Sequence, residues 1–343
     1  MKIIVLAGGT STERAISIVS GANVARTLQA RGHQAALVDV FCGYYRDGAF
    51  DAPCDMEAQV AFMHTFDDRI AEMAASDRPF FGPGVLEECR QADVVFMALH
   101  GSNGEDGKIQ AAFDLMGIKY TGSNYLGSAL AMDKSLTKQI FVGEGVPTPR
   151  GFSLQKGAKI LPCDENGIGL PCVVKPACGG SSVGVSIART PEEYKAALEE
   201  GFSYEDVLVI EEYIKGREFS VGIVDGEAYP VIEIAPVQGF YDYHNKYQPG
   251  STVETCPAEV RPELAARMQD AALAAWRALR LTSYARVDVM MDDQENVYCL
   301  EANTLPGMTP TSLLPQEAAA IGLDFGMLCE RLIEVSAGKK AAV

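Results

Sequence analysis

The chain has 343 residues, of which 48% are hydrophobic and 22% are charged, and its formal net charge is −17. This length predicts two or three domains with real cores, and the acidic balance argues against nucleic-acid binding through a broad basic face. No apolar run approaches the ~20 residues that span a bilayer, and nine dispersed cysteines without zinc-type spacing indicate reduced thiols, so we expect a cytoplasmic protein.

The N-terminal region has the pattern of a parallel α/β fold. Residues 2–7 predict a buried first strand rather than a signal peptide, a helix follows to about Gln29, and 35–40 predicts the next strand. The loop between them, GGTSTER, is not GxGxxG, which disfavours a dinucleotide-dependent dehydrogenase. Glu13, at the helix start, is either an ordinary first-turn acid or a ligand for an ammonium group, because ligands bind where such strands end.

A further buried strand is predicted at 92–99, and HGSNGEDG follows it directly. His100 therefore stands at a carboxyl end of the sheet, as a structural histidine or as a ligand residue. The glycines after it let the backbone approach a ligand, although the spacing is not that of a phosphate-binding P-loop. Residues 41–92 are the least legible part, with a small hairpin expected at 44–50 and a helix at 56–75.

Two helices, about 125–131 and 133–143, lead to a boundary at VPTP, and a β-rich section follows. Its elements are predicted as strands at 172–175, 183–187 and 207–213 and a helix at 191–200. The loop KPACGGSSV joins the first two strands. Its glycines and serines offer N–H and hydroxyl donors, and Lys175 adds a positive charge. The loop either covers phosphate groups or is an ordinary hairpin turn.

The last third contains a hairpin, RVDVMMDDQENVYCLEANTLPGM, at residues 286–308. With a two-residue turn at 294–295, Asp288 lies opposite Glu301, and Arg286 lies opposite Asn303 on the same face. Opposed carboxylates repel, so a proton or a cation must lie between them, and with Asn303 they form a ligand set that Mg²⁺ prefers. The alternative is a hairpin with one solvated polar face. The other face is expected to be apolar and buried: Val287, Val289, Met291, Tyr298, Leu300 and Ala302.

Around this hairpin, strands are expected at 219–224 and 229–234, and helices at about 261–279 and 325–335. The polar, aromatic stretch 237–257 is longer than an ordinary connection, so we expect an ordered lid.

Eight segments, in this order, make the chain resemble the D-alanine–D-alanine ligases of the ATP-grasp superfamily: GGTSTER, HGSNGEDG, AMDK, VVKPACGGSSVGV, EEYIKGREF, FYDYHNKY, RVDVM and EANTLPGMT. The resemblance covers nearly the whole chain and is poorest at 41–92. It implies three domains in an α/β (α+β) ATP-grasp fold. These are a Rossmann-like substrate domain at 1–122, a β-rich ATP-binding domain at 123–215, and an α+β catalytic domain at 216–343 with its lid at about 237–257.

The family uses ATP to phosphorylate the carboxylate of one D-alanine, and the amine of a second then attacks the acyl phosphate, for peptidoglycan precursor synthesis. The resemblance implies that Glu13 holds the first ammonium group, with His100 near its carboxylate. Arg286 and the Gly307 N–H would stabilise the oxyanion, and Ser312 would bind the second carboxylate. In the lid, Tyr247 would close toward Ser181 and Glu13.

The resemblance also implies the nucleotide and metal contacts. Two Mg²⁺ ions, which Mn²⁺ can replace, would be held by Asp288, Glu301 and Asn303. ATP would be bound by Lys134, Lys175, Ser181, Glu211, Glu212, Ile214, Glu218 and Lys246. Some members carry Lys in place of Glu212, so adenine is expected to contact the backbone there.

The sequence also bears on other functions. Lactate-forming relatives usually lack the lid tyrosine, so Tyr247 favours the dipeptide, whereas D-serine as the acceptor is harder to separate. A nucleotide-binding protein without catalysis is disfavoured because the implied catalytic and metal-binding residues are present. Family members are commonly dimers, so the resemblance implies a homodimer, and it implies no nucleic-acid or membrane partner.

Overall fold

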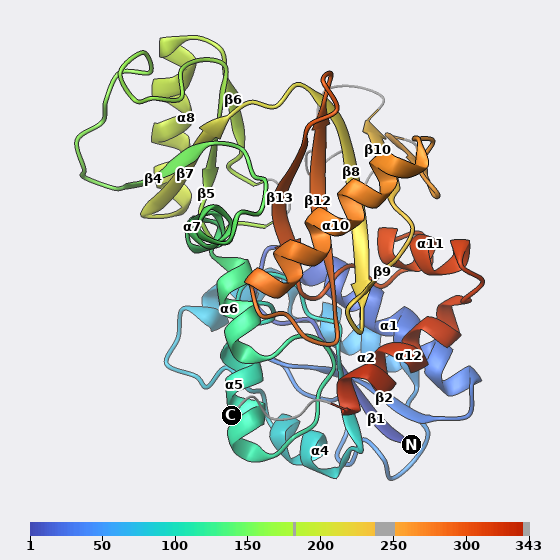
Figure 1. Ribbon diagram of the computed structural model, residues 1–343. Helices are drawn as coiled ribbons and strands as arrows, with labels where there is room; N and C mark the ends of the chain where they lie inside the picture. The colour runs from blue at the N-terminus through green and yellow to red at the C-terminus, as the bar shows by residue number, and fades with distance from the viewer. Residues whose placement is uncertain (181–182, 237–250, 339–343) are drawn as a thin grey trace.

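The computed structural model describes residues 1–180, 183–236 and 251–338. Three sheets form its framework, at residues 2–97, 151–212 and 216–303 (Figure 1). The first sheet is parallel and the other two are antiparallel, which confirms the predicted mixed α/β fold. We propose that these sheets mark the three domains expected from the sequence. No helix in this part of the chain combines the length and apolar composition of a membrane span.

The first sheet has the order β2 (Gln34–Asp39), β1 (Lys2–Ala7), β3 (Val94–Met97). Strand β1 is buried on both faces from its second residue onward, as its uninterrupted apolar sequence predicts. The helices of this region are α1 (Arg14–Ala30), α2 (Met56–His64), the 3₁₀ turn η1 (Asp67–Arg69), α3 (Ile70–Ala74), α4 (Val85–Gln91) and α5 (Lys108–Met116).

Two sequence predictions in this region were wrong. No strand forms at 44–50, because Gly43 and Gly48 both adopt positive φ angles and turn the chain. The helix expected at 56–75 is interrupted after His64 and continues as a 3₁₀ turn and the short helix α3.

The second sheet has the order β4 (Gly151–Gln155), β7 (Val207–Glu212), β5 (Cys172–Pro176), β6 (Ser186–Ala188). Helix α8 (Pro191–Tyr204) packs against it, and α6 (Tyr125–Met132) and α7 (Lys134–Glu144) precede it. Asp133 is the C-cap of α6, and its carboxylate caps α7, since it accepts the N–H groups of Ser135 and Leu136. The cap fixes Lys134 as the first residue of α7.

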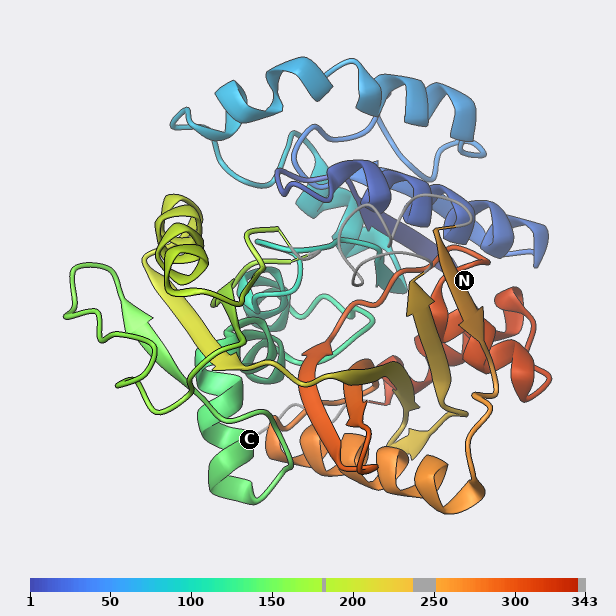
Figure 2. The same cartoon turned by 90° about the horizontal axis from the view of Figure 1, so that it is seen from above.

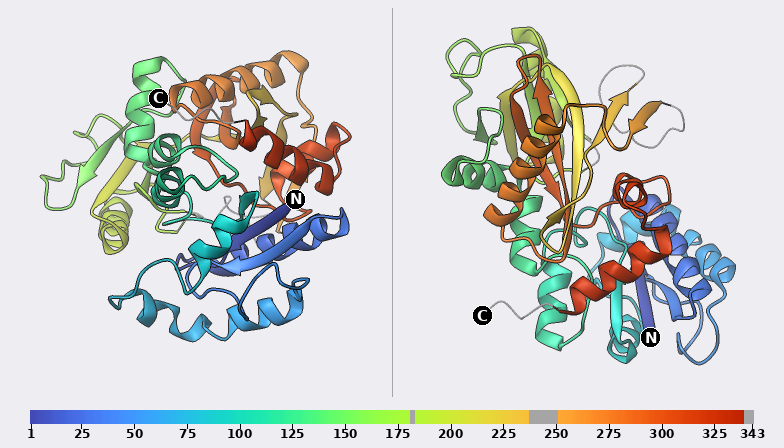
Figure 3. Two further views of the ribbon diagram at one scale, coloured as in Figure 1. Left: turned by 90° about the horizontal axis from the view of Figure 1, so that it is seen from below. Right: turned by 45° about the vertical axis from the view of Figure 1, so that its right-hand side comes forward.

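The third sheet has the order β11 (Thr252–Thr255), β10 (Ile232–Pro236), β8 (Gly216–Val224), β12 (Tyr284–Asp292), β13 (Val297–Asn303), with β9 (Glu227–Ala228) beside β8. Helix α10 (Pro262–Ala278) crosses one face of this sheet (Figure 2). Two helices end the described chain, α11 (Leu313–Ala320) and α12 (Phe325–Ala337). Helix α12 returns to the N-terminal sheet, and its Leu328 and Leu332 join the core of that sheet (Figure 3).

The β12–β13 hairpin has the predicted pairs, Arg286 with Asn303 and Asp288 with Glu301. Its turn is longer than predicted, because Glu295 adopts a left-handed conformation and Asp292 pairs with Asn296. A bulge beyond Asp288 absorbs the extra residue.

The bulge reverses the alternation of β13, so one prediction for its buried face was wrong. Val297 and Cys299 are buried, whereas Tyr298 and Leu300 are only half-buried. Val287, Val289, Met291 and Ala302 are buried as predicted.

Candidate active site

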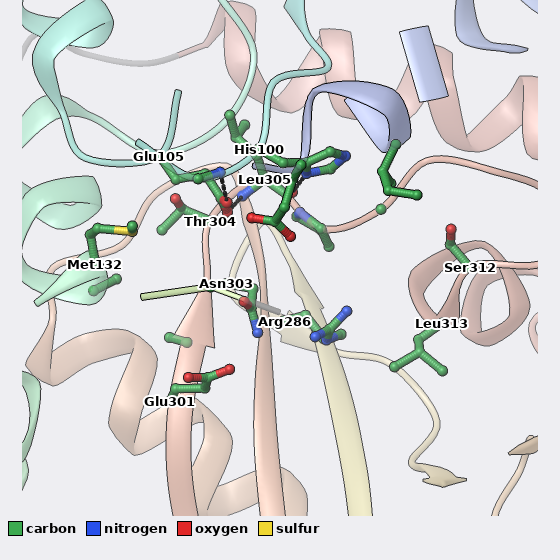
Figure 4. Close-up of a pocket in the computed structure, with 18 of the residues that line it drawn as sticks. His100, Glu105, Met132, Arg286, Glu301, Asn303, Thr304, Leu305, Ser312 and Leu313 are labelled. Atoms are coloured by element: carbon green, nitrogen blue, oxygen red, sulfur yellow. Dashed lines mark hydrogen bonds between the residues drawn. The ribbon is translucent and has the colours of Figure 1, made fainter. Parts of the chain in front are cut away.

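Two cavities meet between the three sheets. The first, of about 320 Å³, contains the residues predicted to bind the two amino acids or to stabilise the oxyanion, namely Glu13, His100, Arg286, Gly307 and Ser312. It also contains the predicted metal ligand Asn303 (Figure 4). The second, of about 430 Å³, contains most of the residues predicted to bind the nucleotide, including Lys175, Glu211, Glu212, Ile214 and Glu218, and also the predicted metal ligand Asp288. Lys134, Gly179, Gly180 and Glu301 line both cavities. A group transferred between molecules in the two cavities would therefore pass these four residues.

The loop that carries Glu13 is held by a buried ion pair. Arg14 lies 2.7 Å from the Asp39 carboxylate and donates to the Gly9 carbonyl at 2.9 Å. Gly8 has a φ of 76°, and a Cβ there would lie 2.5 Å from Asp39, so no other residue fits. Because Asp39 ends β2, the pair fixes the loop to the carboxyl edge of the parallel sheet.

His100 lies in the first cavity with both ring nitrogens near protein atoms. Its Nδ1 is 3.1 Å from the Leu305 carbonyl oxygen, and its Nε2 is 3.4 Å from the Ser20 hydroxyl. Burial lowers the pKa of His100, although the charge of Glu13 opposes this. A neutral ring that donates from Nδ1 to Leu305 satisfies both contacts.

Glu105, from the HGSNGEDG segment, was not singled out by the sequence reasoning. One of its oxygens accepts the Gly101 N–H at 2.8 Å, and the other accepts the Leu305 N–H at 3.1 Å (Figure 4). Burial and the charge of Glu13 raise its pKa to about 7. Glu105 thus ties the loop after β3 to the loop after β13. Its position within a glycine-rich segment was the only available signal.

The acids of the hairpin are matched by basic side chains. Arg286 donates two hydrogen bonds of 2.9 Å to Asp288, and the Asn303 amide donates a third at 3.0 Å. Glu301 lies 3.2 Å from the Lys134 ammonium, which also donates to the Gly179 carbonyl at 2.6 Å. Burial lowers the pKa of Lys134, but Glu301 more than offsets this and the net shift is upward.

These oxygens also fit a hard divalent cation. Asp288 and Glu301 face each other across the hairpin and, with the Asn303 amide, offer the donor set that Mg²⁺ prefers. Within residues 1–180, 183–236 and 251–338, no group of three or more His, Cys, Asp or Glu side chains forms a self-sufficient metal site. A cation here would need further oxygens from a bound molecule, such as phosphates.

Lys175 and a second lysine flank Glu211 in the second cavity. The Lys175 ammonium lies 2.6 Å from one Glu211 oxygen, and that of Lys138 lies 2.5 Å from the other. Burial raises the pKa of Glu211, but the two ammonium groups more than offset this and lower it. Lys138 was missed by the sequence reasoning, although it lies one helical turn after Lys134.

Glu212 is engaged by Arg150, whose backbone N–H and Nε donate to its two oxygens at 2.8 and 2.9 Å. Its side chain is therefore held at the rim, in keeping with the expectation that a ligand meets the backbone there.

The far end of the first cavity is formed by the start of α11. Ser312 is the N-cap of this helix, and its hydroxyl lies 2.8 Å from the Thr309 hydroxyl. A Cβ on Gly307 would lie 2.9 Å from the Ser312 hydroxyl, so glycine lets the two segments meet. Leu313 adds an apolar wall. The predicted residues Ser181, Lys246 and Tyr247 lie outside the described residues.

Comparisons with known proteins decide the family. The model described as D-ala D-ala ligase N-terminus matches residues 2–123, and that described as D-ala D-ala ligase C-terminus matches 150–334. A D-alanine--D-alanine ligase of Pediococcus pentosaceus is 40% identical over 342 residues, which cover 97% of each chain. The chain belongs to the D-alanine–D-alanine ligase family.

Solved structures of this ligase family agree with the fold. The D-alanine--D-alanine ligase from Bacillus anthracis complexed with ATP is 32% identical, with a TM-score of 0.76 and coverage of 98% of this chain and 97% of that one. The VanG D-Ala:D-Ser ligase from Enterococcus faecalis is 27% identical, with a TM-score of 0.78 and coverage of 98% and 99%. The likeness to these ligases confirms the predicted ATP-grasp fold.

Proposed function

We propose that this protein joins two D-alanines to D-alanyl-D-alanine, with ATP converted to ADP and phosphate, for peptidoglycan precursor synthesis. The observation that carries the proposal is the pair of cavities that share Lys134, Gly179, Gly180 and Glu301. One is lined by groups that suit amino-acid ammonium and carboxylate groups, and the other has apolar walls and lysines that suit a nucleotide. The full-length similarity to D-alanine--D-alanine ligases supports the same function.

The chain's own residues suggest the order of events. Glu13 would hold the ammonium group of the first D-alanine, and the neutral His100 would lie beside its carboxylate. That carboxylate would then attack the terminal phosphate of ATP near Lys134, releasing ADP. The amine of the second D-alanine would attack the acyl carbon, lose a proton, and release phosphate as the peptide bond forms.

Fixed donors would stabilise the negative charge of the second step. Arg286 lies on the wall of the first cavity, and Gly307 adds a backbone N–H next to Ser312, which would hold the second carboxylate. Leu313 beside it offers an apolar surface that favours a methyl group over a hydroxymethyl group.

Asp288, Glu301 and Asn303 would hold two Mg²⁺ ions, with Mn²⁺ as a substitute. When bound, these ions would neutralise phosphate charge and align the terminal phosphate. Asp288 already pairs with Arg286, and Glu301 already pairs with Lys134. These pairs show that negative charge is concentrated at this place.

Further parts of the proposal rest on the family resemblance. We infer that Lys175, Glu211, the backbone from Glu212 to Ile214, and Glu218 bind the nucleotide, together with Ser181 and Lys246. Tyr247 would close toward Ser181 and Glu13. We also propose a cytoplasmic location, supported by nine free cysteines, and a homodimer, which light scattering tests.

The test is a competition assay. The protein, ATP and Mg²⁺ are incubated with equal concentrations of D-alanine, D-serine and D-lactate, and the products are identified by mass. We expect D-alanyl-D-alanine to dominate, with one ADP released per dipeptide, and little ADP with L-alanine alone. A dominant D-alanyl-D-serine or D-alanyl-D-lactate product would replace the proposed acceptor. ATP binding without turnover would indicate a nucleotide-binding protein instead.

A further inference from the structure

Helix α11 is fastened to the third sheet by two consecutive residues. Glu317 is fully buried, and its Oε1 accepts the Gly222 N–H of β8 at 3.0 Å. Gln316 donates its amide to the Glu254 carboxylate of β11 and to the Thr311 carbonyl at 2.9 Å. The helix is thus held on two strands at once.

The contact of Glu317 lies on the sheet face that carries Arg286, a residue that lines the first cavity. Gly222 pairs with Arg286 across β8 and β12. A Cβ on Gly222 would lie 2.3 Å from Glu317 Oε2, so the Glu317 carboxyl packs directly against the Gly222 backbone. Ser312, which starts the same helix, is five residues before Glu317. One side chain therefore connects the helix of Ser312 to the strand beside Arg286.

Burying the Glu317 carboxyl costs folding free energy. Among the described residues, Glu317 Oε2 has no hydrogen-bond partner. Burial raises the pKa of Glu317 to about 8, although the Gly222 N–H and the charge of Arg286 oppose this. An apolar side chain would avoid this cost but could not accept the Gly222 N–H.

We propose that Glu317, together with Gln316, is a positioning residue that sets the distance between Ser312 and Arg286 and thereby controls the binding and choice of the acceptor amino acid. This inference rests on the proposed ligase function. Glu13 lies on another element, and Glu218, the residue of β8 nearest to Gly222 that lines the nucleotide cavity, is four residues away. We therefore expect the affinities for the donor and for ATP to change little when Glu317 is replaced.

The experiment compares E317A, E317Q and Q316A with E334A, an exposed control on α12. Initial rates at varied D-alanine are fitted to successive binding of two molecules, and KM for ATP is measured separately. E317A should raise the acceptor KM about tenfold, as expected when a substrate group is misplaced. Its KM for ATP and donor KM should stay within about twofold of the parent. E317Q keeps an acceptor for the Gly222 N–H and should restore most of the acceptor affinity.

A second readout depends on the acceptor step alone. With D-alanine and D-serine in competition, E317A should change the product ratio at least about threefold, and E334A should not. A folded E317A with the parental acceptor KM and product ratio would overturn the inference, as would an E317Q as impaired as E317A. If E317A does not fold, the acceptor KM and the product ratio are measured on Q316A instead. Parental values of both in Q316A would then overturn the inference. If the parent itself makes no dipeptide, the proposed function fails instead.

Discussion

Glu301 and Asp288 place two negative charges where the two cavities meet, and each is matched by a basic side chain. Arg286 holds Asp288 through two hydrogen bonds, and Lys134 lies 3.2 Å from Glu301. The sequence predicted that two opposed carboxylates need a cation between them. The protein supplies cationic side chains to both, and these hold the acids close to where phosphates would lie.

Replacing Glu301 by Gln should abolish most catalysis and leave folding intact. The change keeps the volume and removes one charge that a cation and Lys134 would share. We expect phosphate release with D-alanine and ATP to fall at least about 100-fold. The loss of unfolding free energy should stay below about 3 kcal/mol, the lower end for a fully buried pair, because Glu301 is partly exposed. The matched control, D293N, removes an exposed charge from the same hairpin. A largely unfolded E301Q, or one nearly as active as D293N, would contradict the assignment.

Glu317 should make stability depend on pH. Its carboxyl ionises near the ordinary pKa of ~4.3 when the chain is unfolded, and at about 8 in the folded protein. The folded state therefore binds more protons between these values, and the free energy of unfolding falls as pH rises through them. The groups that act on this carboxyl include Arg286 and Asp288, and it acts in turn on Tyr229 and Cys256.

Glutamine does not titrate, so the unfolding free energy of E317Q should lack this fall with pH. Relative to the parent, it should rise by several kcal/mol between about pH 5 and pH 8, at ~1.4 kcal/mol per pKa unit. Urea denaturation of both proteins at several pH values checks this. A difference that stays constant with pH would mean that Glu317 is ionised in the folded protein.

At the scale of elements, the β12–β13 hairpin shows what a pattern can and cannot predict. The pairing of Asp288 with Glu301 was predicted from an assumed two-residue turn, and it holds because the bulge offsets the longer turn that forms. That longer turn was not predictable, since Glu295 takes a left-handed conformation for which nothing in DDQEN selects, and the bulge that compensates has no residue signature. As a result, the predicted burial of Tyr298 and Leu300 was wrong, while the site-facing residues were placed correctly.

The loop between β1 and α1 should depend on its buried ion pair. D39N keeps the shape of Asp39 but leaves the buried Arg14 with the half-exposed Asp67 as its remaining charged partner, which should cost about 3 kcal/mol of unfolding free energy. The exposed pair of Arg26 and Glu57 is the control, because E57Q should cost less than about 1 kcal/mol. Equal effects of D39N and E57Q in chemical denaturation would show that the buried pair contributes no more than the exposed one.

At the scale of the molecule, the helix α12 near the end of the chain packs onto the core of the N-terminal sheet. Leu332 of α12 is fully buried in the core that contains the N-terminal strands. L332A should therefore cost about 2–5 kcal/mol, whereas M327A, on the exposed side of the same helix, should cost under about 1 kcal/mol. Thermal unfolding of the two variants tests this, and a smaller effect for L332A would mean that α12 is dispensable for the N-terminal fold.

The site residues that could be predicted from sequence are those that follow the ends of strands. Glu13, His100 and Asn303 stand where strands of two sheets finish, and strand ends are visible as breaks in apolar runs. Glu105, Lys138 and Glu317 could not be found this way. Their importance arises from contacts with Leu305, Glu211 and Gly222, which only the packing of separate elements creates.

The central claim is that the carboxylate of one D-alanine is phosphorylated before the peptide bond forms. The most direct test uses D-alanine whose two carboxyl oxygens are both ¹⁸O, with unlabelled ATP and Mg²⁺. If the acyl phosphate forms, each phosphate released with D-alanyl-D-alanine should contain one ¹⁸O atom, because the carboxylate oxygen that attacked ATP leaves with the phosphate. Dipeptide formed together with unlabelled phosphate would contradict this account.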